Sequence, residues 1–223
     1  NINQKIYPVK YRKTVILPKA KLFNRVNWLL EEKYHGKPTK EFNKDIERIK
    51  RGEPLDYVIG FTEFLGCKIN LSKKPLIPRP ETEYWVKKSI QNILTYSSLS
   101  VCSENGEVKV LDLFAGSGCI GVAVLKHIPN TFVSFAEKDK KCLEQIRINC
   151  KINFGENYSP IRANGRMIAK GKRYKIIQSD VFSNVIGRFN YIFANTPYIA
   201  KNKDSRLKIQ ESVLKYETKG ALF

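Results

Sequence analysis

The stretch Val110–Val124, which reads VLDLFAGSGCIGVAV, constrains the fold of this chain more than any other. An apolar run reaches Asp112, a glycine-rich turn follows, and a second apolar run comes after the turn. Gly116 and Gly118 can supply the positive φ and the close backbone approach that such a turn needs. A helix after the turn would present free N–H groups to a ligand. With Gly121 the spacing satisfies G-x-G-x-x-G, which indicates a strand, turn and helix that bind a nucleotide-like ligand.

The size and charge of the chain limit its class. Its 223 residues suffice for one α/β domain and a small accessory domain. No run of about 18 apolar residues occurs, so we expect no membrane span. The net charge of +19 favours a polyanionic neighbour such as RNA or a ribosomal particle, although the lysines are scattered and solvated lysines explain the charge equally well. Five cysteines without a C-x-x-C pair, and only two histidines, predict reduced thiols and no metal site.

The first third of the chain predicts helices and then a hairpin. Apolar residues recur at helical spacing in 22–30 and again in 42–49, which indicates two short helices in a small N-terminal module. Short β-like runs at 61–64 and 67–71 predict a hairpin. Three prolines within 75–80 then require an extended segment, and a helix follows from residue 81 to 94.

From residue 109 onward, strands alternate with helices, which is typical of a parallel sheet that is covered on both faces. We expect the strands at 109–113, 132–136, 175–178 and 191–194, with helices at 120–127 and 140–153. The polar, basic segment 154–172 is expected to be a surface insertion.

Each of the four predicted strands ends in a polar residue, namely Asp112, Glu137, Asp180 and Asn195. Ligands of open α/β sheets bind outside the carboxyl ends of the strands, so these residues should converge on one crevice. Glu137 lies where an acidic side chain accepts hydrogen bonds from ribose hydroxyls. Asp180 is placed to accept from an adenine amino group, or else to cap a helix that begins at Val181.

A dinucleotide dehydrogenase would also have these glycines and Glu137, but it would give no reason for Asn195–Tyr198. This Asn-Thr-Pro-Tyr block resembles the Asn-Pro-Pro-Tyr motif of amino-group methyltransferases that use S-adenosylmethionine. Together with Leu76–Glu83, the glycine turn and Gln178–Phe182, it is similar to the glutamine N5-methyltransferases of peptide chain release factors. The similarity runs from about residue 57 to the last residue.

The resemblance implies a class I methyltransferase fold, that is, an α/β Rossmann-like parallel sheet. It divides the chain into a helical substrate-recognition module (1–56), a β-hairpin linker (57–80) and an S-adenosylmethionine-binding domain (81–223). The substrate amide would be held by Asn195, Thr196, Pro197 and Tyr198. The cofactor would contact Asp112, Phe114, Ala115, Gly116, Ser117, Gly118, Glu137, Asp180, Val181 and Asn195.

The implied reaction is methylation of the glutamine in the Gly-Gly-Gln loop of a release factor, by a monomer in the cytoplasm of a bacterium or, alternatively, in the mitochondrial matrix. Two other functions remain open: a DNA or RNA adenine or cytosine amino-methyltransferase, and a weakly active binding module of RNA or the ribosome. The sequence departs from the family at Thr196, which replaces the first motif proline. It also stops at Phe223, where the family continues with more strands, so we expect a C-terminally truncated domain.

Overall fold

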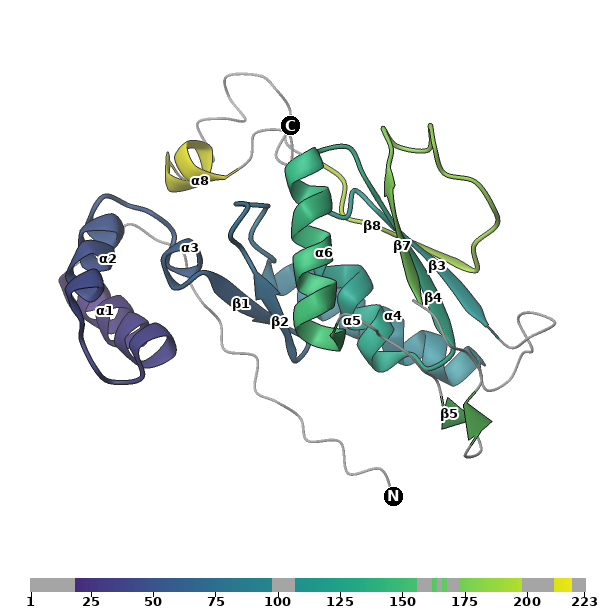
Figure 1. Cartoon of the computed structure of the whole chain (residues 1–223), viewed down its shortest axis with the longest axis horizontal. Coiled ribbons are helices and arrows are strands. Elements are labelled where there is room, and N and C mark those ends of the chain that lie inside the picture. The colour runs from purple at the N-terminus through teal and green to yellow at the C-terminus, as the bar shows by residue number, and fades with distance from the viewer. Residues whose placement is uncertain are drawn as a thin grey trace.

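The computed structural model describes residues 19–97, 107–155, 162–163, 166–167, 173–197 and 211–217. A helical part and a sheet-containing part are joined by a hairpin (Figure 1). Within these ranges no helix is both long and apolar enough to cross a membrane.

The N-terminal part consists of three helices, α1 (Lys19–Tyr34), α2 (Lys40–Lys50) and α3 (Leu55–Ile59). The first two confirm the prediction from helical spacing, whereas α3 was not predicted because its five residues are too few to show a period. The helices share an apolar core of their own, formed by Leu29, Phe42, Ile49, Leu55, Val58 and Ile59. This core gives the three helices a packing centre separate from that of the sheet.

The predicted hairpin is present as strands β1 (Phe61–Phe64) and β2 (Cys67–Asn70), which pair antiparallel. Its two turn residues, Leu65 and Gly66, both have positive φ values, 47° and 71°. Such backbone angles suit the right-handed twist of a two-residue hairpin. An extended segment then leads into α4 (Pro80–Ser97), which continues slightly beyond the predicted end of that helix.

The main sheet confirms the α/β prediction. Its four strands are β3 (Val108–Leu113), β4 (Thr131–Glu137), β7 (Tyr174–Gln178) and β8 (Tyr191–Ala194), all parallel, in the order β7-β4-β3-β8. The chain builds outward from β3 on one side and then returns to add β8 on the other. The sheet therefore has a switch point outside the carboxyl end of β3. A separate two-stranded pair, β5 (Arg162–Ala163) and β6 (Arg166–Met167), lies within the predicted insertion.

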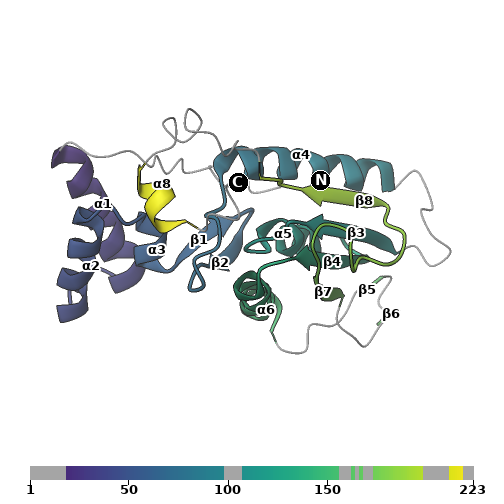
Figure 2. The same ribbon diagram turned by 90° about the horizontal axis from the view of Figure 1, so that it is seen from above.

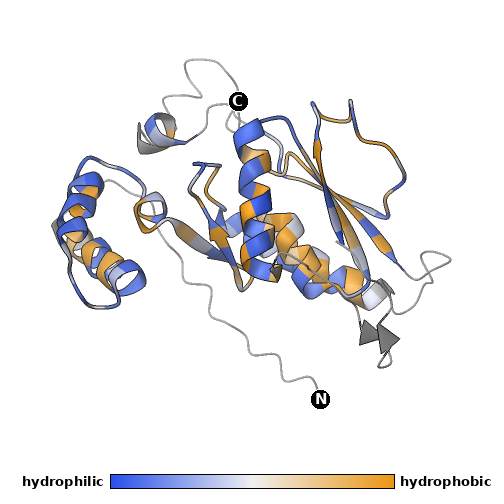
Figure 3. Cartoon of the chain, viewed as in Figure 1, coloured by the Kyte–Doolittle hydropathy of each residue, from blue (hydrophilic) through white to orange (hydrophobic). Residues whose placement is uncertain are grey.

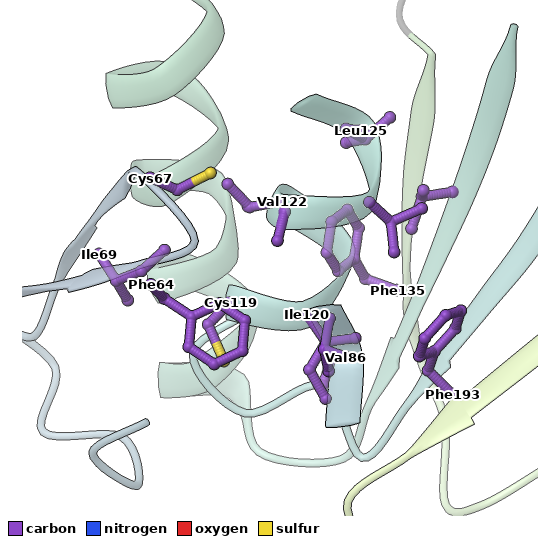
Figure 4. Packing of buried hydrophobic residues seen from close by; sticks show 14 of the residues in the cluster. Phe64, Cys67, Ile69, Val86, Cys119, Ile120, Val122, Leu125, Phe135 and Phe193 are labelled. Atoms are coloured by element: carbon purple, nitrogen blue, oxygen red, sulfur yellow. The ribbon is translucent and has the colours of Figure 1, made fainter. Parts of the chain in front are cut away.

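Three helices pack on one face of this sheet: α4, α5 (Cys119–His127) and α6 (Lys140–Phe154) (Figure 2). The central one, α5, is almost wholly hydrophobic, whereas α6 carries polar residues on its outer side (Figure 3). Phe135 of β4 and Phe193 of β8 contribute to the core beneath these helices (Figure 4). Trp85 of α4 stacks on Phe193, with ring centroids 5.9 Å apart.

The second face of the sheet is covered too, as predicted, but in the part of the chain that the structure describes its cover is a loop. On the second face, Leu111, Leu113 and Ala136 pack against Val185 and Phe189. Both residues belong to the connection between β7 and β8, which consists of turns and contains no helix in residues 179–190. This face is consequently covered by a loop, and Ile192 of β8 remains 54% exposed.

Candidate functional site

A cavity of about 340 Å³ lies at the carboxyl ends of β3, β4 and β8. Its volume falls within the range of small-molecule sites. Its position is the one that the switch point predicts. Of the residues predicted from the sequence, the following line it: Phe114, Ala115, Gly116, Ser117, Glu137, Asp180, Val181, Asn195 and Pro197.

The glycine turn forms the floor of the cavity between β3 and α5. Phe114, Gly116 and Gly118 have φ values of 58°, 53° and 75°, so the backbone passes three times through the left-handed region. Gly118 does not line the cavity; a Cβ at this position would lie 3.1 Å from the side chain of Ile146. Glycine at this position therefore permits both the positive φ of the turn and its close packing against α6.

Glu137 is already engaged within the protein. One carboxylate oxygen accepts the backbone N–H of Gly116 at 2.8 Å. The other accepts the N–H groups of Lys138 and Asp139 at 2.7 and 2.9 Å. The carboxylate therefore ties the end of β4 to the glycine turn, and a ligand with hydroxyl groups would find its acceptor oxygens fixed in place.

Asp112 was predicted to contact the cofactor, but its side chain does not reach the cavity. Its side chain is fully buried under the turn and is absent from the cavity wall. One oxygen accepts the N–H of Gly121 at 2.9 Å, and the other has no hydrogen-bond partner. Burial raises the pKa of Asp112 to about 8, because the Gly121 hydrogen bond offsets the lost hydration only in part and the negative charge of Glu137 adds to the rise. The carboxyl group acts as an internal brace of the turn.

This raised pKa predicts how stability depends on pH. Above the unfolded-state pKa of about 4, the folded protein keeps a proton on Asp112 that the unfolded chain has lost, so the contribution of Asp112 to stability falls as the pH rises toward 8. We expect the free energy of unfolding of the wild type, relative to Asp112→Asn, to fall by up to about 1.4 kcal/mol per pH unit in this window. Urea denaturation at several pH values measures this difference. Parallel curves for the two proteins would contradict it, and Glu63→Gln, at an exposed position, serves as the control.

Asp180 lies on the cavity rim, 61% exposed at its side chain, and pairs with Lys138 at 2.6 Å. No helix begins at Val181. Instead, the hydroxyl of Ser179 accepts the N–H of Asn184 and donates to the carbonyl of Val181. Val181 itself has a φ of 52°, a costly conformation for a β-branched residue. The turn therefore holds Val181 in a strained position at the cavity wall.

The strand-ending block Asn195–Tyr198 reaches the cavity in part. Asn195 and Pro197 line it and are half-buried, whereas the side chain of Thr196 is exposed and does not. Tyr198 lies outside the described residues. The arrangement brings an amide side chain from the end of β8 to the same cavity as the glycine turn.

Part of the wall was not assigned by sequence reasoning. Leu76, Ile77, Pro78 and Thr82, from the proline-rich segment and the start of α4, form an apolar side of the cavity. The Leu76–Glu83 motif was part of the family resemblance, but the sequence alone did not assign these residues to the cavity. Cys119 and Cys142 also line the cavity, and burial raises the pKa of both thiols to about 12, so they are neutral, unreactive parts of the wall.

The parallel sheet and this cavity at its switch point define a Rossmann-like ligand-binding domain. The family model "Methyltransferase small domain" matches residues 96–219, more than half of the chain. The chain belongs to this family.

Curated relatives extend the similarity toward the N-terminus. The release factor glutamine methyltransferase of Lactococcus lactis is 30% identical over 90% of this chain and 64% of the relative. Proteins of the same name from Flavobacterium psychrophilum and Borreliella burgdorferi are 31% and 28% identical, over 79% and 83% of this chain and 54% and 55% of their own lengths. This chain thus spans between about half and two thirds of these relatives.

Proposed function

We propose that the chain belongs to an enzyme that transfers a methyl group from S-adenosylmethionine to the side-chain amide nitrogen of the glutamine in the Gly-Gly-Gln loop of a peptide chain release factor. One observation carries the proposal: Asn195 and Pro197 line the same cavity as the glycine turn and Glu137. The names of the curated relatives support it.

The residues of the cavity fit the cofactor. Glu137 offers fixed carboxylate oxygens for ribose hydroxyls, and the turn Phe114–Ser117 offers backbone polar groups beside it. The apolar side chains of Leu76, Ile77 and Val181, which all line the cavity, suit an adenine ring. When bound, S-adenosylmethionine supplies a methyl group on a sulfonium, which is a strong methyl donor.

The protein must position the acceptor nitrogen, because an amide nitrogen is a weak nucleophile whose lone pair is delocalised into its carbonyl. In our proposal the side-chain oxygen of Asn195 accepts one N–H of the substrate amide, and the backbone carbonyl of Thr196 accepts the other. Both bonds direct the nitrogen toward the methyl group, and such orientation can contribute roughly 7 to 11 kcal/mol in the best cases. Tyr198 would pack against the amide and exclude water. No general base is needed before transfer, because the proton becomes acidic only after methylation.

The substrate would be gripped by the N-terminal module, for which we propose residues 1–56, joined by the linker 57–80 to the catalytic domain 81–223. The separate apolar core of α1–α3 supports a module of this kind. We further propose that the enzyme is a monomer that acts in the bacterial cytoplasm, where release factors work. The net charge of +19 would favour proximity to the ribosome.

Incubation with methyl-labelled S-adenosylmethionine tests the proposed function. We expect label in a bacterial release factor, and none in a variant whose Gly-Gly-Gln glutamine is replaced by alanine. Label in DNA or RNA instead would establish the nucleic-acid amino-methyltransferase, which the Asn-x-Pro-Tyr block also allows. Binding of the cofactor without transfer to any of these substrates would favour the weakly active binding module.

Thr196 gives a prediction about turnover. The proline that this position has in the family restricts φ, so Thr196→Pro should pre-organise the backbone carbonyl that accepts the substrate N–H. A compatible proline typically contributes about 0.4 to 1 kcal/mol, which corresponds to a roughly two- to fivefold rise in kcat. Steady-state methyl transfer measures it. Thr196→Val, which adds no ring, should show no rise, and an unchanged or lower kcat for Thr196→Pro would refute the explanation.

A further inference from the structure

One ion pair joins segments that are far apart in the sequence. Nη2 of Arg79 lies 2.7 and 2.8 Å from the two carboxylate oxygens of Glu217. The Glu217 side chain is completely buried and that of Arg79 is 24% exposed. A buried ion pair is costly to form, so its presence beside a cavity wall is not explained by stability alone.

The pair acts on the part of the chain that forms the apolar wall. Arg79 directly follows Ile77 and Pro78, both of which line the cavity. Burial raises the pKa of Glu217, and the Arg79 guanidinium and the backbone N–H of Ile77 oppose that rise, so the carboxylate interacts with the chain on both sides of Pro78.

The wall formed by Leu76, Ile77 and Pro78 is held by hydrogen bonds to other parts of the chain. Residues 74–79 belong to no helix or strand, and proline has no N–H for a backbone ladder. At the other end of the segment, the hydroxyl of Tyr57 donates to the carbonyl of Pro75 at 2.6 Å. Tyr57 and the Arg79–Glu217 pair therefore add to the core packing of Ile77 in fixing the position of the wall.

Glu217 is the residue directly after helix α8 (Glu211–Tyr216). Its backbone N–H donates to the carbonyl of Val213 at 3.0 Å, which continues the helix by one bond. The hydroxyl of Tyr216 donates to the carbonyl of Arg51, just after α2. Figure 1 shows α8 beside the N-terminal helices and away from the sheet. The pair thus connects the cavity wall to a segment that also contacts the N-terminal module.

We propose that Glu217 is a positioning residue, which together with Arg79 holds the Leu76–Pro78 wall in the shape that binds S-adenosylmethionine. Glu217 is not among the residues that line the cavity, and it acts through Ile77 and Arg79. The inference rests on the proposed function, because it assigns the wall to that cofactor. It makes affinity for the cofactor depend on a residue at the far end of the chain.

Two variants test the pair. Glu217→Gln removes the negative charge and leaves Arg79 without a counterion, so we expect the Kd of S-adenosylmethionine to rise at least tenfold. Because this variant could also unfold, the double variant Arg79→Met/Glu217→Leu removes both charges and keeps apolar volume. Replacement of a buried pair by apolar side chains is often neutral or stabilising. We expect this double variant to unfold at no lower urea concentration than the wild type and still to bind at least tenfold more weakly.

Calorimetry of the cofactor on the full chain measures Kd. Hydrogen exchange of the Ile77 amide, measured without ligand, should be at least tenfold faster in the double variant, since the carboxylate that interacts with it is gone and the segment is held less tightly. The exposed pair Glu47–Lys50, with its atoms 2.7 Å apart, provides the control: Glu47→Gln/Lys50→Gln should change neither quantity.

The outcomes separate the two proposals. A folded double variant with the Kd and the Ile77 exchange rate of the wild type would show that the pair is structural only, and would overturn the inference while the proposed function stands. A wild-type chain that binds no S-adenosylmethionine would overturn both. A raised Kd and faster Ile77 exchange in the double variant, with an unchanged control, would support the positioning role.

Discussion

Replacing Asn195 by alanine is expected to reduce kcat for methyl transfer by about 100-fold or more, whereas the Kd of S-adenosylmethionine should change by less than about tenfold. The reason lies in the proposed reaction. The substrate amide loses one of its two acceptors, and a misplacement of about 1 Å from the reactive geometry can cost a factor of about 100 in rate. Most of the cavity wall, including the glycine turn and Glu137, is left intact.

The neighbouring residue provides a matched control. The proposed role of Thr196 belongs to its backbone carbonyl, and its side chain is exposed and outside the cavity wall. Thr196→Ala should therefore keep kcat within about threefold of the wild type. Single-turnover measurements with saturating cofactor separate the chemical step from binding. Turnover of Asn195→Ala within threefold of the wild type would rule out the assigned role.

Gly121→Ala is expected to destabilise the fold by about 3 kcal/mol, at the upper end of the usual range for an overfilled core. A Cβ at this position would lie 2.2 and 2.7 Å from ring atoms of Phe135 and 3.0 Å from the carboxylate of Asp112. Phe135 is completely buried, so its ring has no space to move into. The methyl group would also disturb the hydrogen bond between the Gly121 N–H and Asp112.

Urea denaturation of a double-mutant cycle measures this effect. Phe135→Leu alone should cost stability through lost burial, but it makes room at the point of contact. Added to Phe135→Leu, the Gly121→Ala change should cost at least about 1 kcal/mol less than it costs in the wild type, which is a coupling typical of residues in contact. A Gly121→Ala protein within about 0.5 kcal/mol of the wild type would show that helix α5 can move away from β4.

The strands and the convergence of their ends could be predicted from the sequence because they depend on local patterns. Each apolar run of the sheet is short and ends in a polar residue, and parallel strands bring those ends to one edge. Glu137 and Asn195 were placed correctly at the cavity for this reason. Helix α3 could not be predicted, since five residues carry no period.

Other features depend on contacts that no local pattern encodes. Asp112 was expected at the ligand, yet it is buried under the turn, because α5 packs over the face of β3 from which its side chain projects. The cavity wall from Leu76 to Pro78 is followed directly by Arg79, whose partner Glu217 is 138 residues away. The second face of the sheet is covered by a loop because the connection between β7 and β8 folds into turns.

In the proposed function, the cavity at the switch point binds S-adenosylmethionine. Isothermal titration calorimetry of the chain tests it directly, with NAD as the comparison ligand, because a dinucleotide site would have the same glycine spacing. We predict saturable binding of S-adenosylmethionine at one site and no binding of NAD under the same conditions. Binding of NAD, or no binding of S-adenosylmethionine by the folded chain, would contradict the assignment.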